Sequence, residues 1–579
     1  MWKLAKYLKH YKKEVILGPA FKLTEAILEL IAPLIMANII DVGIRNSDSD
    51  YILRMGGLMI LIAAVGLCCA LICQYFAAKA SQGFGTNLRN EMFSHIASLS
   101  HAEIDTLGTP SLITRITNDV NQLQVAVAML IRLVIRAPFL VIGATVMAMM
   151  IDFQMSLIFV AAAAGIAVVL YLVMSRSVPF YRAIQKLLDR ISLVTRENLA
   201  GVRVIRAFSK QEKEQERFDE GTDELKKASV RVGKISALLN PFTYLIVNAG
   251  IIAIIWFGGG AVNTGALEQG QIVALVQYMT QILLALIVVA NLVVIFTKAS
   301  ASAARVNEVL ETQASVADGK NAPENADKGA DIPKIEFQNV SFSYGGDEMD
   351  LENVSVKIMR GQTIGVIGGT GSGKSTFVNL IPRFYDASKG RILVDGEDVR
   401  EYPFSVLRGQ IGMVPQQAVL FSGTVRENMR WRDDSATDDE IWAALRTAQA
   451  CGFIEKFPQK LDTPVLQGGK NLSGGQRQRL TIARALVGRP EILILDDSAS
   501  ALDFATDAAL REALREYGRE ITVIMVSQRA TTLKNADKII VFDDGQVVGV
   551  GTHEELFETN AVYREICLSQ LSEGEVRHG

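Results

Sequence analysis

The chain contains 579 residues, of which 49% are hydrophobic and 21% are charged. Its mean hydropathy of +0.24 excludes an ordinary soluble protein of this length and favours a membrane protein with two or more domains. The formal net charge is only −3, which gives no reason to expect nucleic acid as a partner. The five cysteines form no recognisable disulfide framework, because three cluster in one apolar segment and two stand far apart.

Six apolar stretches lie in the first three hundred residues. Each supplies the roughly 20 residues that are needed to cross about 30 Å of hydrocarbon. We therefore predict an all-α transmembrane domain over residues 1–311, with membrane helices near 15–40, 53–79, 126–150, 156–176, 240–262 and 271–297.

Positive charge is distributed unevenly between the connecting segments. The N-terminal segment and the long segments 80–125 and 177–239 are rich in Lys and Arg, whereas the short loops 42–50, 151–154 and 261–270 contain almost none. By the positive-inside rule, the basic segments and both chain ends face the cytosol, as expected for a multi-pass protein of the bacterial inner membrane. The two long segments keep a helical pattern and would extend membrane helices roughly 30 to 45 Å into the cytosol.

A few polar side chains interrupt the apolar spans and are candidates for contact with a substrate or a gate. Lys22, Glu25 and Glu29 recur at three- and four-residue spacing on one face of the first span, and charges that face lipid are costly. The simpler alternative is a Lys22–Glu25 pair that satisfies itself near the interface. Amides in membrane spans are ambiguous in the same way, because they also join helices to each other. The remaining candidates are an acidic residue at the outer end of the first span and two amides of the sixth: Asp41, Gln277 and Gln281.

The last part of the chain has a different pattern. Residues 312–333 are polar, show no apolar period and are predicted to be a hydrated linker. From residue 334 to 579, strand and helix patterns alternate, which is typical of an α/β domain.

A phosphate-binding loop lies early in this α/β domain. Residues 368–375 read GGTGSGKS and match G-x-x-x-x-G-K-[ST] at every fixed position, between an apolar strand candidate and a helical pattern. In such a loop, backbone N–H groups wrap the phosphates of a nucleotide, the lysine reaches the outer phosphates and the next hydroxyl holds Mg²⁺. The predicted ligands are Gly368, Gly369, Thr370, Gly371, Ser372, Gly373, Lys374, Ser375 and Thr376.

Two acidic residues follow a second apolar strand candidate, residues 492–495. Four consecutive apolar residues are typical of a buried strand, which would deliver Asp496 to the metal ion. Asp497 then occupies the position where a general base for the attacking water would lie.

Further motifs make the chain resemble the ATP-binding-cassette (ABC) proteins. Residues 472–476 read LSGGQ, which is the signature of that family. Tyr344 resembles the aromatic residue that stacks on adenine, and Gln416 resembles the glutamine of the Q-loop. Residues 500–503 resemble the D-loop, and Gln528 occupies the switch position, which is normally a histidine. The motifs stand in the family's order over about two hundred residues.

The resemblance implies ATP and Mg²⁺ as cofactors, with Ser375, Gln416 and Asp496 around the metal ion. It also implies a dimer, because in this family the signature of one cassette caps the ATP that is held by another. The signature residues expected to act on the partner's ATP are Ser473, Gly474, Gly475 and Gln476.

The resemblance covers essentially the whole chain and implies a half-transporter of the six-helix exporter type: one all-α membrane domain plus one α/β P-loop nucleotide-binding domain. Residues 1–12 resemble the family's elbow helix on the inner membrane surface. Residues 101–110 and 209–216 resemble the turns that press on the nucleotide domains, the coupling helices.

Two positions depart from the family pattern. Asp497 replaces the usual glutamate and is one methylene shorter, and Gln528 replaces the histidine and cannot carry a positive charge. A misplaced base costs on the order of 10²-fold in rate. The sequence therefore predicts a degenerate site that binds ATP but hydrolyses it poorly. The alternative is that Asp497 reaches far enough and the site works slowly.

The intact signature predicts an asymmetric assembly. The expected partner is a second half-transporter that carries the glutamate and the histidine, so we favour a heterodimer over a homodimer. The expected function is ATP-driven export of hydrophobic or amphipathic compounds, of the multidrug type. The alternatives are export of a dedicated lipid, peptide or thiol, and an ATP-gated channel or regulatory subunit that hydrolyses weakly.

Overall fold

A computed structural model of the chain describes residues 2–320, 332–346, 348–498, 501–517 and 521–570. Contacts between residues divide the chain into two compact units. The helical unit comprises Met1–Ala97 and Thr109–Thr312, and the α/β unit comprises Ser98–Gly108 and Gln313–Gly579. Half of the predicted linker, residues 321–331, lies outside the described residues.

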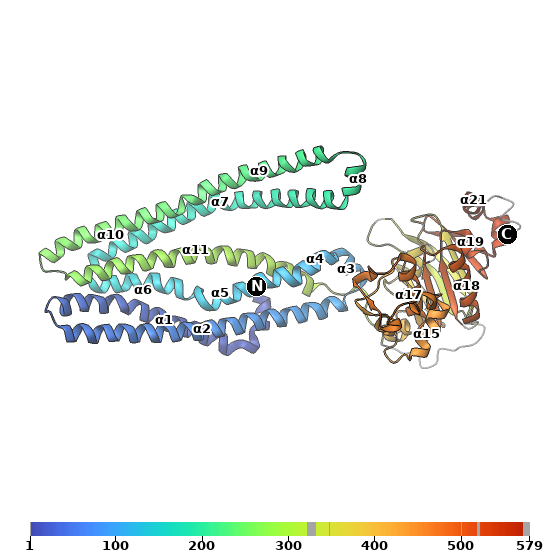
Figure 1. Cartoon of the computed structure of the whole chain (residues 1–579), viewed down its shortest axis with the longest axis horizontal. Coiled ribbons are helices and arrows are strands. Elements are labelled where there is room, and N and C mark those ends of the chain that lie inside the picture. Colours follow the sequence, from blue (N-terminus) through green and yellow to red (C-terminus); the bar gives the residue numbers. More distant parts are fainter. Residues whose placement is uncertain (1, 321–331, 347, 499–500, 518–520, 571–579) are drawn as a thin grey trace. The chain divides into compact units, whose positions relative to one another are not determined.

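In the described part of the chain, six helical stretches are long and apolar enough to cross a membrane (Figure 1). Each of the six predicted spans falls within one of them, and the all-α membrane domain is confirmed. The stretches are Lys3–Ile44, Ser49–Ser98, Thr109–Ile151, Phe153–Ala200, Gln211–Asn263 and Gln269–Glu311.

Three wide turns, in which the hydrogen bond closes over five residues, occur in these stretches: one forms the end of the first stretch, and two interrupt the third without ending it. They are η2, η3 and η4. The elements of the helical unit are η1 (Trp2–Tyr11), α1 (Lys12–Asn38), η2 (Ile39–Ile44), α2 (Ser49–Ser98), α4 (Thr109–Thr114), η3 (Arg115–Asp119), α5 (Val120–Met129), η4 (Leu130–Val134), α6 (Arg136–Ile151), α7 (Phe153–Ala200), α8 (Val202–Ala207), α9 (Gln211–Ala237), α10 (Leu239–Asn263) and α11 (Gln269–Glu311).

The short helix α8 joins the antiparallel helices α7 and α9 (Figure 1). The sequence placed this turn at residues 209–216, but the chain reverses earlier, because Gly201 ends α7 and Ser209 adopts a left-handed backbone with φ of 52°. The charged residues from Gln211 onwards instead form the first turns of α9, and we correct the predicted position accordingly.

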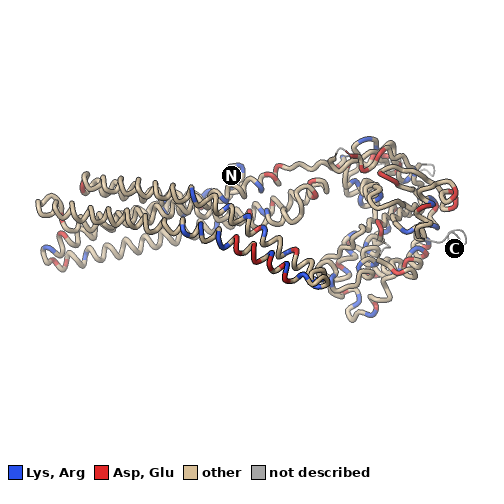
Figure 2. The backbone as a smooth tube through the Cα atoms, turned by 90° about the horizontal axis from the view of Figure 1, so that it is seen from above, with Lys and Arg blue, Asp and Glu red and all other residues tan. Residues whose placement is uncertain are grey.

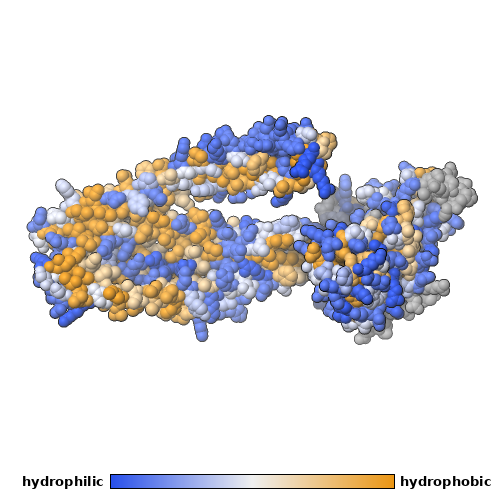
Figure 3. Space-filling model, viewed as in Figure 1, coloured by the Kyte–Doolittle hydropathy of each residue, from blue (hydrophilic) through white to orange (hydrophobic). Residues whose placement is uncertain are grey.

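The outer surface of the helical unit is apolar at the level of the predicted spans. Leu53, Ile60 and Trp256 expose 73%, 73% and 78% of their surface. Hydrophobic residues form a broad region there (Figure 3), and charged residues are sparse at this end of the helices and gather towards the other end (Figure 2). Such a surface is stable against lipid and not against water.

Small residues allow three membrane helices to approach closely. Ala26 of α1, Ala144 of α6 and Ala274 of α11 are fully buried in one shared core. A methyl group at Gly270 would strike the α1 backbone, so α11 begins directly against the end of α1. There the Asp41 carboxylate accepts the Gly270 N–H at 2.6 Å.

The α/β unit contains, in its described residues, a six-stranded sheet of order β12-β11-β3-β10-β9-β6 and a four-stranded sheet of order β2-β1-β4-β5. In the larger sheet all strands but β12 run parallel. The strands are β1 (Ile335–Phe342), β2 (Leu351–Ile358), β3 (Thr363–Gly368), β4 (Lys389–Val394), β5 (Glu397–Asp398), β6 (Ile411–Val414), β7 (Gly423–Thr424), β8 (Pro464–Val465), β9 (Ile492–Asp496), β10 (Thr522–Val526), β11 (Lys538–Asp543) and β12 (Gln546–Gly551).

Helices cover the larger sheet, as the alternation of patterns predicts for a parallel sheet. The described helices of the α/β unit are α3 (His101–Leu107), α12 (Lys374–Leu380), α13 (Phe404–Gln410), α14 (Val425–Arg430), α15 (Asp438–Thr447), α16 (Cys451–Ile454), η5 (Lys460–Asp462), η6 (Gln467–Gly469), α17 (Gly474–Leu486), α18 (Phe504–Tyr517), α19 (Ala530–Leu533), α20 (His553–Thr559) and α21 (Ala561–Gln570).

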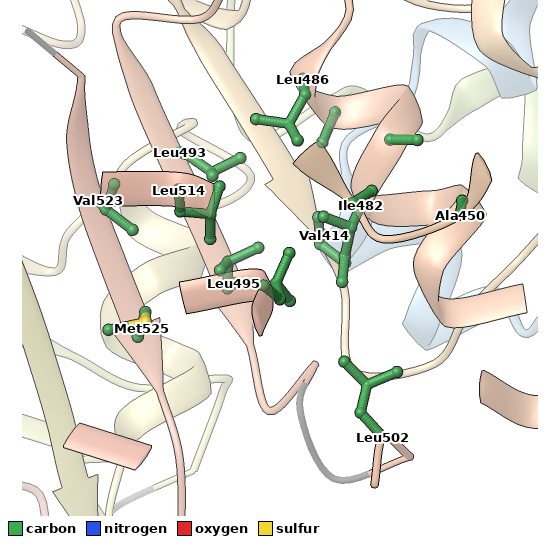
Figure 4. Packing of buried hydrophobic residues seen from close by; sticks show 14 of the residues in the cluster. Val414, Ala450, Ile482, Leu486, Leu493, Leu495, Leu502, Leu514, Val523 and Met525 are labelled. Atoms are coloured by element: carbon green, nitrogen blue, oxygen red, sulfur yellow. The ribbon is translucent and has the colours of Figure 1, made fainter. Parts of the chain in front are cut away.

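Strand β9 lies in the middle of the buried core, between β10 and β6. All five of its residues are buried. Figure 4 shows Leu493 and Leu495 packed among side chains of the neighbouring strands and of α17, including Val414 and Ile482. Because both faces of the strand are covered, the backbone at its carboxyl end is held firmly in position.

A buried ion network joins the ends of the two sheets. Lys334 is fully buried, and its ammonium group donates to Asp395 and Glu491 at 2.6 Å each and to the Gln410 side chain at 3.0 Å. Arg360 pairs with the same two carboxylates. Every hydrogen of the ammonium group is therefore satisfied, as a buried charge requires.

We expect Lys334→Met to lower the free energy of unfolding by about 3 kcal/mol, because the buried Asp395 carboxylate loses its fully buried cation and keeps only the partly exposed Arg360. Lys357→Met, which removes a mostly exposed partner of Glu336, should cost about 1 kcal/mol or less. Thermal unfolding of the full chain in detergent measures both, and equal losses would contradict the assignment of the network.

Candidate nucleotide site

The phosphate loop lies between β3 and α12, as the sequence predicts. Gly371 and Gly373 adopt left-handed backbones, with φ of 82° and 93°. A methyl group at Gly373 would lie 2.7 Å from a Leu351 methyl and 2.9 Å from the Asp350 carbonyl oxygen. Only glycine fits this position, so the tight approach of the loop to β2 explains the last glycine of the motif.

Lys374 begins α12 and lies under the loop. Its ammonium group donates to the Gly368 carbonyl at 3.0 Å, to the Gly369 carbonyl and to the Ser372 hydroxyl at 3.3 Å. Burial lowers the pKa of Lys374, and the nearby carboxylates of Asp497 and Asp496 oppose this shift. The lysine is therefore a buried cation at the place where phosphate would enter.

Asp496 ends the buried strand β9, and only 6% of its surface is exposed. Its carboxylate accepts a hydrogen bond from the Ser375 hydroxyl at 3.3 Å. Burial raises the pKa of Asp496, and Asp497 adds to this increase, against the hydrogen bond from Ser375. A carboxylate beside a hydroxyl, both oxygen donors, suits Mg²⁺, which prefers oxygen ligands and would supply charge neutralisation on phosphate oxygens.

Asp497 follows in a left-handed backbone with φ of 45°, a conformation that Asp tolerates better than most residues. Its N–H donates to the Val526 carbonyl at 3.0 Å, which ties it to the next strand. Burial raises the pKa of Asp497, while Lys374, Arg529 and a hydrogen bond with Gln416 act in the opposite direction. A carboxyl with a raised pKa is a stronger base once it is ionised.

A cavity of about 180 Å³ connects the predicted nucleotide residues. The loop, the Q-loop glutamine, both aspartates and the switch position all contribute to its wall. The lining residues are Thr370, Gly371, Lys374, Ser375, Gln416, Asp496, Asp497, Val526, Ser527 and Gln528.

The signature residues do not line this cavity. Ser473 caps α17: its hydroxyl accepts the Gln476 N–H at 3.3 Å, and the Gln476 side chain accepts the Ser473 N–H at 2.9 Å. Ser473 and Gly474 are exposed at this helix end and Gly475 is half-buried. Of the D-loop, Ser500 lies outside the described residues.

Tyr344 also lies outside the cavity wall. Its exposed ring contacts Phe342 and Tyr385 edge-on, with centroids 4.8 and 5.0 Å apart. The Tyr385 hydroxyl donates to Asp105 of α3 at 2.9 Å. The first of the predicted coupling segments is thus joined, within the α/β unit, to the tyrosine expected to contact adenine.

A second contact anchors α3. The His101 ring stacks on Phe384 with centroids 4.4 Å apart. Burial and the nearby Arg408 guanidinium lower the pKa of His101. Phe384 and Tyr385 carry no motif that sequence reasoning had singled out; only the fold brings them to α3.

The switch loop has a partner that the sequence did not reveal. Gln570, the last residue of α21, donates to the Gln528 carbonyl at 2.7 Å and accepts the Ala530 N–H at 3.0 Å. The amide thus bridges two backbone groups of the loop, and no sequence motif marks a glutamine forty residues away.

The membrane candidates fall into separate pairs. Lys22 pairs with Glu25 at 2.6 Å, as the simpler alternative expects, and Glu29 pairs with Arg136 of α6 at 2.6 Å. The Gln281 amide donates to the Glu29 carbonyl at 3.3 Å. Gln277 is half-buried and makes no hydrogen bond with any residue that the structure describes.

Comparison with known proteins supports both the membrane domain and the nucleotide-binding domain. Residues 15–286 match the ABC transporter transmembrane region family, and residues 351–500 match the ABC transporter family. An uncharacterized ABC transporter ATP-binding protein of Mycobacterium tuberculosis is 38% identical over 98% of this chain and 97% of its own length. The chain belongs to the ABC transporter family.

Three further comparisons concern this ABC exporter. YgaD of Bacillus subtilis, provisionally named a multidrug export ATP-binding/permease protein, is 32% identical over 98% of the exporter and 99% of its own length. An ATP-dependent lipid A-core flippase of Hahella chejuensis is 32% identical over 86% of the exporter and 85% of its own length. The solved structure of a bacterial Atm1-family ABC exporter with ATP bound has a TM-score of 0.78, at 25% identity over 98% of the exporter and 99% of that chain.

We expect Lys374→Met to raise the dissociation constant for ATP about 10-fold or more, because the change removes a buried cation from the phosphate cavity. Lys389→Met, the same change at an exposed residue of β4, should leave the constant unaltered. Titration of the full exporter with ATP and Mg²⁺ measures both, and equal affinities would contradict this site.

Proposed function

We propose that this ABC exporter is one half of a heterodimer that exports hydrophobic and amphipathic compounds across the inner membrane. We further propose that its own phosphate-loop site holds ATP and hydrolyses it slowly. The observation that carries the proposal is the cavity in which Asp497 and Gln528 meet Lys374 and Asp496. Phosphate-binding residues stand there beside a shortened base and an uncharged switch residue.

Slow hydrolysis follows from the requirements of water attack. A general base must lie within hydrogen-bond reach of the water, and a misplacement of about 1 Å costs on the order of 10²-fold. Asp497 begins from a backbone that is fixed by β9 and by the Val526 carbonyl, so the side chain has little freedom to recover the missing methylene. Gln528 can donate a hydrogen bond but adds no positive charge.

The exposed signature supports a partner chain. Ser473 and Gly474 present the N-terminus of α17 to solvent and do not line the exporter's own cavity. A helix N-terminus attracts phosphate, so the signature can complete an ATP site on a second cassette. A partner with a glutamate base would then perform most of the hydrolysis.

Two observations bear on the substrate. The name of YgaD fits the multidrug class, and the exposed apolar surface of the helices fits apolar cargo. The flippase of Hahella chejuensis favours the second candidate, export of a dedicated lipid. The positive-inside rule places both chain ends, and with them the α/β unit, in the cytosol.

We expect Asp497→Glu combined with Gln528→His to raise the rate of ATP hydrolysis at this site about 10-fold or more. The longer carboxylate would reach the attacking water, and the histidine would restore a group that can carry positive charge. Hydrolysis is measured with the full exporter assembled with its partner, whose own base is replaced by glutamine. Asp544→Glu, the same lengthening at an exposed left-handed position, serves as the control. An unchanged rate, with ATP affinity retained, would show that these side chains are not limiting.

The export function is tested in liposomes. Unrelated amphipathic compounds should stimulate ATP hydrolysis by vesicles that contain both half-transporters. The same compounds should accumulate in the lumen of those vesicles whose nucleotide domains face outwards. Response to a single lipid class would instead indicate the dedicated exporter. Brisk, transport-coupled hydrolysis by the purified homodimer of this chain would overturn the heterodimer.

A further inference from the structure

The predicted membrane spans contain five charged residues away from their ends. Three are cations and two are carboxylates, so the interior of the spans carries one excess positive charge. The residues are Lys22, Glu25, Glu29, Arg132 and Arg136. Charge inside a membrane is costly and is normally paired or used.

Both carboxylates already have a cation. Lys22 and Glu25 pair at 2.6 Å, with 17% and 18% of their side chains exposed, and Arg136 pairs with Glu29 at 2.6 Å. Among the described residues, Arg132 makes no hydrogen bond and no ion pair. The excess charge of the spans is therefore located on the Arg132 guanidinium.

Arg132 lies in the wide turn η4, four residues before Arg136. Wide turns of this kind are frequent at functional sites. A Cβ added at Gly18 of α1 would lie 2.6 Å from an Ile131 methyl, so η4 packs against α1 about one helical turn from Lys22. The free guanidinium of Arg132 therefore lies on a turn that packs against the helix of the Lys22–Glu25 pair.

Two buried polar atoms near Glu29 also lack a partner within the described residues. They are Nε of Arg136 and Oε1 of Gln281. The Arg136 guanidinium contacts the Glu29 carboxylate, and the Gln281 amide contacts the Glu29 backbone. Buried polar atoms are rarely left unpaired in a finished site. One unused N–H donor, one unused acceptor and one free cation therefore occur on helices that pack together.

We propose that Arg132, with Arg136 Nε and Gln281 Oε1, receives the anionic group of an amphipathic substrate: a phosphate, sulfate or carboxylate. The guanidinium of Arg132 neutralises the anion, Arg136 Nε donates to it, and Gln281 Oε1 accepts from a hydroxyl or N–H beside it. The inference rests on the proposed export function and names its substrate class.

The simpler alternative is that the Arg132 side chain extends towards the cytosolic surface of the membrane. It lies six residues from the predicted cytosolic end of its span, or about 9 Å along the helix. An arginine that serves only the lipid boundary would have no effect on the choice between anionic and cationic substrates. This difference provides the test.

The experiment compares taurocholate, an anionic amphiphile, with rhodamine 6G, a cationic one. Both are titrated into phosphatidylcholine liposomes that contain the full exporter assembled with its partner, and ATP hydrolysis is followed. Arg132→Met should raise the half-maximal concentration of taurocholate about 10-fold or more and shift that of rhodamine 6G less than about twofold. Arg132→Lys, which keeps the charge, should recover most of the loss.

Arg176→Met is the matched control, because Arg176 is an exposed arginine at the end of the predicted fourth span. It should leave both responses and the basal hydrolysis unaltered. Equal shifts for both probes in Arg132→Met, or no shift for either, would overturn the anion site. A wild type that responds to rhodamine 6G alone would also overturn it and leave export intact. A wild type that responds to neither probe and accumulates neither would defeat the export proposal itself.

Discussion

The burial of strand β9 on both faces is the constraint on which the nucleotide site depends. Ile492–Leu495 pack between neighbouring strands and α17, so the carboxyl end of the strand has one allowed position. That position brings Asp496 to Ser375 and Asp497 to Lys374 and Gln416. Because the backbone cannot shift without opening the core, the length of each side chain decides what it reaches. Under the proposed function, the missing methylene of Asp497 would therefore slow hydrolysis, whereas on a mobile loop its effect would be minor.

The membrane half depends on a related constraint. Lipid replaces water around the spans, so apolar side chains can face outwards while every charge inside needs an opposite charge. The spans meet this need for Lys22 and Arg136 through Glu25 and Glu29. Small residues such as Ala26 and Ala144 let α1 and α6 pack closely, and the Glu29–Arg136 pair joins these two helices.

Within the α/β unit, α3 is held by the His101–Phe384 stack and by the Tyr385–Asp105 hydrogen bond. The same tyrosine contacts Tyr344, the residue expected beside adenine. The Gln570 side chain donates to the Gln528 carbonyl and so anchors the switch loop to α21. Both α3 and the switch loop are therefore held by side chains that no sequence motif marks.

The sequence predicts a feature well where the function needs only a local pattern. Twenty apolar residues are enough to cross a membrane, and the phosphate loop is contiguous, so the spans, the α/β domain and the loop residues could all be predicted. Contacts that join distant segments are harder to predict from the sequence. The turn at α8 was displaced because the end of a helix depends on the backbone at Gly201 and Ser209, and a charged patch continues a helix as readily as it ends one.

The sequence by itself determined the family, the class of membrane topology and the amino-acid types of the predicted nucleotide site, because these depend on residue type and short spacing. Only the tertiary structure decided which side chains share one cavity and which of the membrane charges are already paired. It also decided that Gln570, outside every motif, contacts the switch loop and that Arg132 has no partner among the described residues. Those relations are distances between segments that are far apart in the chain, and they arise from packing.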